Sequence, residues 1–187
     1  MLRWFVLGCL FELSLGMGGL GIYALAGRSV ASDFFLSGQA MLFGIASILP
    51  MLAGFFWCLN SKNQAAADIR LILNTLLRPV MGSWSHRRWL CIALLAGVSE
   101  ELLFRGAIQG GLESSLGTTF AWLLASLLFG LAHPLSSTYF LLTTLMGAYL
   151  GGLYLVTGNL LVPMVAHAAY DYFALYAFFR RRSGNQE

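Results

Sequence analysis

Three polar motifs interrupt the most hydrophobic part of the chain. Together they supply six ionisable side chains: Glu100, Glu101, Arg105, His133, His167 and Asp171. Carboxylates and imidazoles exchange protons near neutral pH, so such a set can activate a water molecule for hydrolysis. Charged groups inside a bilayer are costly, and they usually face a bundle interior where they pair or do chemistry. We therefore expect these six side chains to form one functional site.

The two glutamates of the first motif have different surroundings. Glu101 and Arg105 are spaced i,i+4 with the acid first, which favours an ion pair along one helix face. Glu100 lies about 100° around the helix from Glu101 and has no partner within its own helix. One negative charge is therefore left over. In a medium of low dielectric constant this excess negative charge is expected to raise the pKa of Glu100, which suits a general base that works near neutral pH.

The last motif places His167 and Asp171 at i,i+4, so both side chains can face one cavity. From the helix rise, Glu100 lies about 16 Å from the cytoplasmic end of its segment and His133 roughly 8 Å from that side. His167 lies about 12 Å from the outer side by the same measure. The groups are therefore expected to converge in a mid-membrane cavity that is closer to the cytoplasm.

Each motif also has a purely structural interpretation. The glutamate–arginine pair could be a buried ion pair, and the histidine–aspartate pair a hydrogen-bonded core contact. His133, which precedes Pro134, could be a helix-end residue in the membrane interface. Glu12 has no partner at helical spacing and is interpreted as polarity at a packing interface. The coincidence of so many ionisable groups on successive apolar segments favours the shared site.

The elements that must position these groups are hydrophobic helices. Of the 187 residues, 58% are hydrophobic and 10% charged, and the mean hydropathy is +0.75. This composition predicts an all-α, polytopic membrane helix bundle. Six segments are long enough to cross a hydrocarbon core of roughly 30 Å: about 2–26, 39–59, 89–112, 118–134, 138–157 and 159–179.

Basic residues predict the orientation in the cell membrane, because basic flanks stay cytoplasmic. With the N-terminus inside, Arg28 is external, Arg105 lies within a span, and the other nine basic residues are cytoplasmic. Both termini are thus expected in the cytoplasm. The net charge of +3 is then explained by basic residues on the cytoplasmic side, where they contact anionic lipid. No nucleic-acid partner is expected. A cleaved signal peptide is the alternative for the first segment, but that run is long and contains Glu12.

The one long connection, residues 60–88, has its own pattern. Apolar residues at helical spacing predict an amphipathic helix on the cytoplasmic face that stops near Pro79. Trp84 and Trp89 are interpreted as interfacial anchors. The alternative for this helix is a gate for a lipid-borne substrate. The apolar positions are Ile69, Ile72, Leu73, Leu76, Leu77 and Val80.

The chain is accordingly divided into two parts. Residues 1–84 hold two transmembrane helices and the amphipathic linker, and residues 85–187 hold a four-helix core joined by short turns. The tail that begins at Arg180 is interpreted as a stop-transfer flank followed by a few disordered residues. Small residues spaced four apart, Gly106 with Gly110 and Gly147 with Gly151, predict close helix packing.

The three motifs match a family pattern. "EELLFR" fits EExxxR, "FGLAH" fits FxxxH and "HAAYD" fits HxxxN/D, in order on successive apolar segments. This set resembles the CPBP family of intramembrane glutamic endopeptidases, which includes type II CAAX prenyl endopeptidases and Abi or bacteriocin-processing proteins. The resemblance covers roughly residues 85–175, about half of the chain.

The resemblance implies proteolysis inside the membrane with no metal and no cofactor. Glu100 would be the general base and His133 its partner in activating water, while Glu101 and Arg105 would hold the base in place. His167 and the residue at 171 would stabilise the oxyanion. The implied partner is a peptide or protein substrate entering from the bilayer or the cytoplasmic face, such as a CAAX-like protein, a signal-like peptide or a bacteriocin leader.

Asp171 departs from the commoner asparagine of the pattern. A carboxylate that faces an oxyanion would repel it, so Asp171 must either carry a proton or orient His167. We favour the second role, because i,i+4 spacing permits it and a protonated imidazole would strengthen an oxyanion hole.

Three other functions compete with proteolysis. Glutamate and histidine could bind zinc, although no HExxH is present. The acid and histidine could relay protons in a transporter, although no inverted repeat is visible. The chain could also be a non-catalytic immunity or scaffold protein. The sequence leaves the substrate and the oligomeric state open.

Overall fold

The computed structural model describes residues 2–180, and every regular element in that range is helical. The predicted all-α membrane fold is therefore confirmed. The tail beyond Arg180 lies outside the described residues. The elements are α1 (Leu2–Leu25), η1 (Val30–Ser32), α2 (Gly38–Ala46), α3 (Ile48–Asn60), α4 (Gln64–Ile72), η2 (Leu73–Leu77), α5 (Arg78–Met81), α6 (His86–Glu101), η3 (Leu102–Gln109), α7 (Gly110–Leu116), α8 (Thr118–Leu131), α9 (Ser137–Thr157) and α10 (Leu161–Arg180).

All six predicted hydrophobic segments are helical. Three helices of the described chain are long and apolar enough to cross a membrane: Leu2–Leu25, Gly38–Asn60 and Ser137–Thr157. The helix Thr118–Leu131 is apolar but shorter. The other two segments, α6–η3–α7 and α10, carry most of the predicted site residues, and their polar side chains lower the mean hydropathy.

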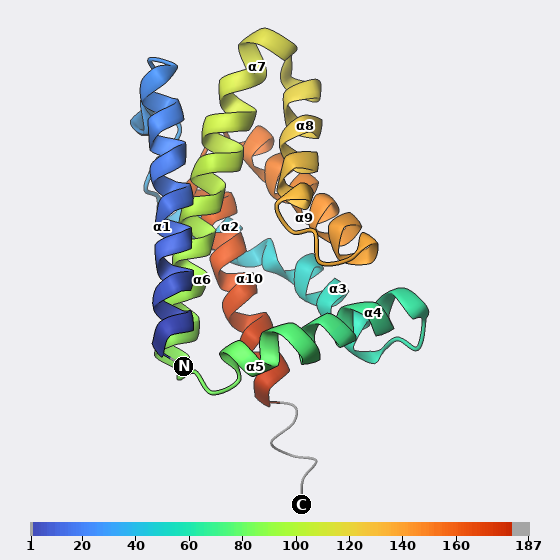
Figure 1. The fold of residues 1–187 in the computed structure, drawn as a ribbon. Helices are drawn as coiled ribbons and strands as arrows, with labels where there is room; N and C mark the ends of the chain where they lie inside the picture. Colours follow the sequence, from blue (N-terminus) through green and yellow to red (C-terminus); the bar gives the residue numbers. More distant parts are fainter. Residues whose placement is uncertain (1, 181–187) are drawn as a thin grey trace, which may run out of the picture.

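Helix α10 lies at the centre of the bundle, packed against α6, α2, α3 and α9 (Figure 1). Helix α1 covers α6 and η3 from the other side and runs parallel to them. The N-terminal helices therefore pack directly onto the predicted core. The proposed division at residues 84 and 85 stays a prediction.

Glycines set the closest helix contacts. A Cβ atom added at Gly97 of α6 would lie 2.7 Å from the backbone nitrogen of Ala168 in α10, so only glycine permits this approach. Gly147 and Gly151 face the α8 residues Ser126 and Trp122 at similarly short range. The expectation that the glycine pairs are packing surfaces is confirmed, because a larger residue would push these helices apart.

A wide helical turn follows the two glutamates. Segment η3 is π-helical, and the N–H of Gly110 donates to the carbonyl of Arg105, five residues back. Helices α6, η3 and α7 thus form one interrupted rod over residues 86–116. Such π segments are rare and occur mostly at functional sites. The sequence pattern gave no sign of this turn.

The linker helix crosses the end of the bundle where the N-terminus lies (Figure 1). It consists of α4, the π-helical η2 and α5, and it ends at Met81, two residues beyond Pro79, close to the predicted stop. Proline is tolerated there because it lies in the first turn of α5. The wide turn also shifts the apolar face, so that Leu76 is exposed while Leu77 turns inward.

Trp84 at the end of the linker and Trp89 in α6 are not membrane anchors. Trp84 and Trp89 are each 6% exposed, which removes them from the lipid interface. The indole N–H of Trp89 donates to the carbonyl of Met81 at 3.0 Å, and its ring stacks on Phe179. Trp84 packs edge-on against Phe5. These rings instead fasten the linker and α1 to the bundle.

A polar cluster fixes the far end of α1. Arg28 forms an ion pair with Asp33 at 2.6 Å and donates to the carbonyl of Gly106 at 2.8 Å. The hydroxyl of Tyr23 donates to the same Asp33 carboxylate at 2.6 Å. Through these bonds the position of α1 along η3 is held by directional contacts as well as by apolar packing.

Candidate active site

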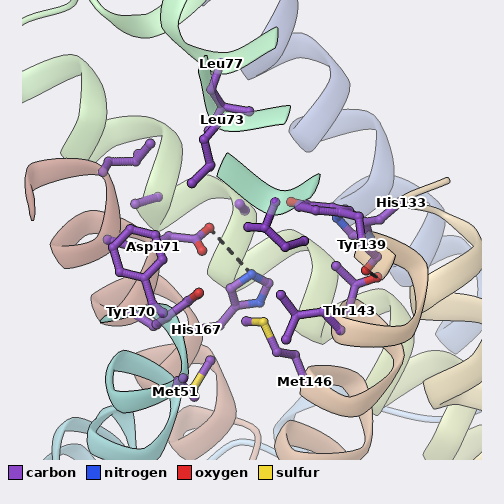
Figure 2. A pocket seen from close by; sticks show the side chains of 18 of the residues that line it. Met51, Leu73, Leu77, His133, Tyr139, Thr143, Met146, His167, Tyr170 and Asp171 are labelled. Carbon is purple, nitrogen blue, oxygen red and sulfur yellow. Dashed lines mark hydrogen bonds and ion pairs between the residues drawn. The ribbon is translucent and has the colours of Figure 1, made fainter. Parts of the chain in front are cut away.

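Four of the six predicted site residues line one cavity of about 440 Å³. Helices α1, α3, α4, α5, α6, α9 and α10 contribute to its wall, together with η2, the end of α8 and the residue His133 just after it (Figure 2). Most of the lining is apolar, and Met51, Leu73 and Leu77 are typical of it. The ionisable groups in the wall are Glu12, Cys58, Glu100, His133, Tyr139, Tyr149, His167, Tyr170 and Asp171.

Glu101 and Arg105 form the predicted ion pair at the back of the site. The guanidinium donates to Oε1 of Glu101 at 2.7 Å, and both residues are at most 1% exposed. Arg105 also donates to the carbonyl of Gly147 in α9 at 2.9 Å and lies 4.3 Å from the ring centre of Phe129. One arginine therefore joins η3, α8 and α9 behind the cavity.

Glu100 meets His133 across the cavity. Oε2 of Glu100 and Nε2 of His133 are 3.9 Å apart, which is too long for a hydrogen bond. At that separation both atoms can contact one water molecule. Glu100 is 6% exposed, and its Oε2 accepts no hydrogen bond from the described residues.

The FxxxH spacing orients the ring of His133. Nδ1 of His133 lies 2.8 Å from the carbonyl oxygen of Phe129, one helical turn earlier. A carbonyl only accepts, so Nδ1 must carry the hydrogen. In the neutral ring Nε2 then has a free lone pair directed toward Glu100. The side chain of Phe129 packs between the imidazoles of His133 and His167, with ring centres 4.9 and 5.9 Å away.

His167 lies between two carboxylates. Its Nδ1 is 2.8 Å from Oε1 of Glu101, and its Nε2 is 3.5 Å from Oδ2 of Asp171 (Figure 2). The expected proximity of His167 and Asp171 is observed. The contact with Glu101 was not anticipated, because the relative rotation of α6 and α10 depends on tertiary packing.

The six predicted residues thus lie in one place, in two layers. Glu100, His133, His167 and Asp171 face the cavity, and the Glu101–Arg105 pair lies behind its wall. Sequence reasoning assigned Glu12 to a packing interface and so missed that it lines the same cavity. Its signal was a carboxylate in the middle of an apolar segment. Tyr139 and Tyr170 also line the cavity, and the sequence carries no signal of this because tyrosines are common in membrane helices.

Metal binding needs at least three converging ligands in most protein sites. In the part of the chain that the structure describes, no group of three or more His, Cys, Asp or Glu side chains has the arrangement to hold a metal ion. The six predicted side chains are instead close to one another in pairs: Glu101 with Arg105 and His167, Glu100 with His133, and His167 with Asp171.

Comparison with known proteins gives a consistent result. A family model described as type II CAAX prenyl endopeptidase Rce1-like matches residues 82–173, the region that holds all three motifs. No solved structure matches the chain significantly.

Two curated proteins are similar to the chain over most of its length. One is the Bacillus subtilis (strain 168) protein named "Putative membrane peptidase YdiL", 29% identical over 163 residues, or 79% of this chain. The other is human CAAX prenyl protease 2, 28% identical over 152 residues, or 68% of this chain. The matches span 63% and 46% of these relatives' own lengths.

Proposed function

We propose that this chain is a CPBP-family intramembrane endopeptidase that hydrolyses peptide bonds without a metal ion. The observation that carries this proposal is the approach of Glu100 to His133 inside a largely apolar cavity. A carboxylate and an imidazole that contact the same water molecule can remove a proton from it and hold it in position, as general-base hydrolysis requires.

In the proposed reaction Glu100 takes a proton from the water, and the resulting hydroxide attacks the scissile carbonyl carbon. His133 holds that water through Nε2, because its Nδ1 is engaged by the carbonyl of Phe129. When the tetrahedral intermediate collapses, the C–N bond breaks and Glu100 returns the proton to the leaving amine. The apolar wall limits competing water around the reacting groups.

His167 is the proposed donor to the oxyanion. A protonated His167 can donate its Nδ1–H to Glu101. Its Nε2–H, 3.5 Å from Oδ2 of Asp171, can then donate to the developing negative charge. Arg105 balances the charge of Glu101, so Glu101 can position His167 without remaining an uncompensated buried anion. In this proposal Glu101 and Arg105 are positioning residues.

Asp171 is expected to act through the orientation of His167. Asp171→Ala should lower kcat about 10- to 100-fold with little change in KM, as is typical for loss of a partner that orients a reacting group. Asp171→Asn should retain most of the activity, because an amide oxygen can still accept from Nε2. Steady-state kinetics of both variants checks this. Full activity in both would remove Asp171 from the mechanism.

The substrate is proposed to be a membrane-associated peptide or protein that enters from the bilayer or the cytoplasmic face. Both termini are proposed to be cytoplasmic, since basic residues flank that side of the spans. Prenylated CAAX sequences, signal-like peptides and bacteriocin leaders all have apolar portions that suit the cavity wall.

Purified protein in lipid nanodiscs provides the test. We expect it to cleave a peptide from this group and to remain fully active with EDTA or 1,10-phenanthroline, because no step uses a metal ion. Mass spectrometry locates the cleaved bond, and a metalloprotease in the same nanodiscs verifies that the chelator works. Loss of cleavage with chelator would favour zinc hydrolysis, and proton-coupled uptake in liposomes without cleavage would favour a transporter.

A further inference from the structure

Glu12 is a buried carboxylate that the proposed reaction does not use. Glu12 lies in the middle of α1 and is 8% exposed, and its Oε2 accepts no hydrogen bond from the described residues. Leaving such a group unsatisfied in an apolar interior is costly. A carboxylate in this position therefore calls for a partner that enters the cavity.

The packing of α1 directs Glu12 into the cavity. Gly8 faces Ile92, and Gly16 lies so close to Ser99 that an added Cβ would be 2.9 Å from the serine oxygen. Glu12 lies midway between these two glycines on the same helix face. The small residue Ala96 stands one turn before Glu100 in this part of the wall, and both line the cavity with Glu12.

The charges that face the cavity do not balance. Three carboxylates line it, from α1, α6 and α10, and each of the two imidazoles in the wall lies near one of them. His133 is near Glu100, and His167 is near Asp171. Arg105, the cation of the first motif, is engaged by Glu101 behind the wall. Within the described chain, Glu12 is therefore the cavity carboxylate for which no ion pair is found.

We propose that Glu12 forms a subsite for a basic side chain, lysine or arginine, that flanks the scissile bond of a peptide substrate. The proposal rests on the proposed peptidase function and names a feature of its substrate. A lysine or arginine has an apolar stem and a charged end, which matches an apolar wall with a carboxylate set into it. A charged donor also satisfies a carboxylate better than a neutral one does.

The experiment uses pairs of fluorogenic peptides of one cleavable sequence, with lysine or its uncharged analogue norleucine placed in turn at each position beside the scissile bond. At one of these positions the wild-type protein should cleave the lysine peptide with a kcat/KM about tenfold higher, chiefly through a lower KM. Glu12→Gln should bring this ratio close to one. Glu113→Gln, at an exposed position of α7 outside the cavity, should retain it.

A binding measurement separates this proposal from the proposed function. Fluorescein-labelled versions of both peptides are titrated onto Glu100→Gln protein, with and without Glu12→Gln, by fluorescence anisotropy. Tighter binding of the lysine peptide that disappears with Glu12→Gln supports the subsite even if no peptide is cleaved. An equal lysine-to-norleucine ratio in wild type and Glu12→Gln, in cleavage and in binding, overturns it.

Discussion

We expect Glu100→Gln to lower kcat for peptide cleavage by about a thousandfold, which lies within the range for loss of a general base. Glutamine has nearly the same shape as glutamate, so the cavity and the contact with His133 should remain. It cannot take a proton from water, and the loss should therefore fall on kcat while KM changes little. Steady-state kinetics in nanodiscs provides the measurement.

Two controls make this result interpretable. Glu113→Gln makes the same chemical change at an exposed position outside the cavity and should have wild-type kinetics. The elution profile and thermal denaturation of Glu100→Gln should match wild type, since the residue makes no hydrogen bond that the fold depends on. Retention of more than a tenth of wild-type kcat would exclude Glu100 as the base.

The second large effect concerns stability. Arg105→Met should destabilise the protein by about 3–5 kcal/mol, because it removes the arginine partner of the buried Glu101 carboxylate and leaves His167 as its remaining ionic contact. It also removes the donor to the carbonyl of Gly147. Methionine keeps much of the apolar volume, so the loss comes mainly from the charge and the hydrogen bonds. Thermal denaturation in detergent measures it.

The matched control is Arg87→Met, since Arg87 is exposed at the start of α6 and should be replaceable at little cost. The double variant Glu101→Gln, Arg105→Met removes both charges and should recover part of the stability lost in Arg105→Met. Equal denaturation temperatures for Arg105→Met and wild type would show that the buried pair contributes nothing to folding.

Local periodicity made much of this arrangement predictable. The i,i+4 spacing within one helix is fixed by the backbone, which is why Glu101 with Arg105 and His167 near Asp171 could be expected. Length and hydropathy were enough to locate the six helical segments. Their convergence followed from the cost of isolated charges in an apolar bundle.

The remaining features depend on contacts between helices. Glu101 reaches His167 only because α6 and α10 approach closely at Gly97, and Glu12 reaches the cavity only because α1 packs on α6 through glycines. Nor does hydrophobic periodicity reveal a five-residue turn. The interpretation of Trp84 and Trp89 as membrane anchors was wrong because both rings are buried. Their burial depends on where the linker helix lies across the bundle, which the sequence pattern does not determine.

The wide turn in η3 determines how the two halves of the rod over residues 86–116 are rotated relative to each other. A π segment corresponds to one residue inserted into an α-helix, and one residue amounts to about 100° of rotation. Deleting one residue between Leu102 and Gln109 would leave a regular helix whose two halves are turned relative to each other by that angle. Glu100 could then face the cavity, or Gly106 could face Arg28, but not both. The length of this segment is thus as much a part of the site as the identity of its side chains.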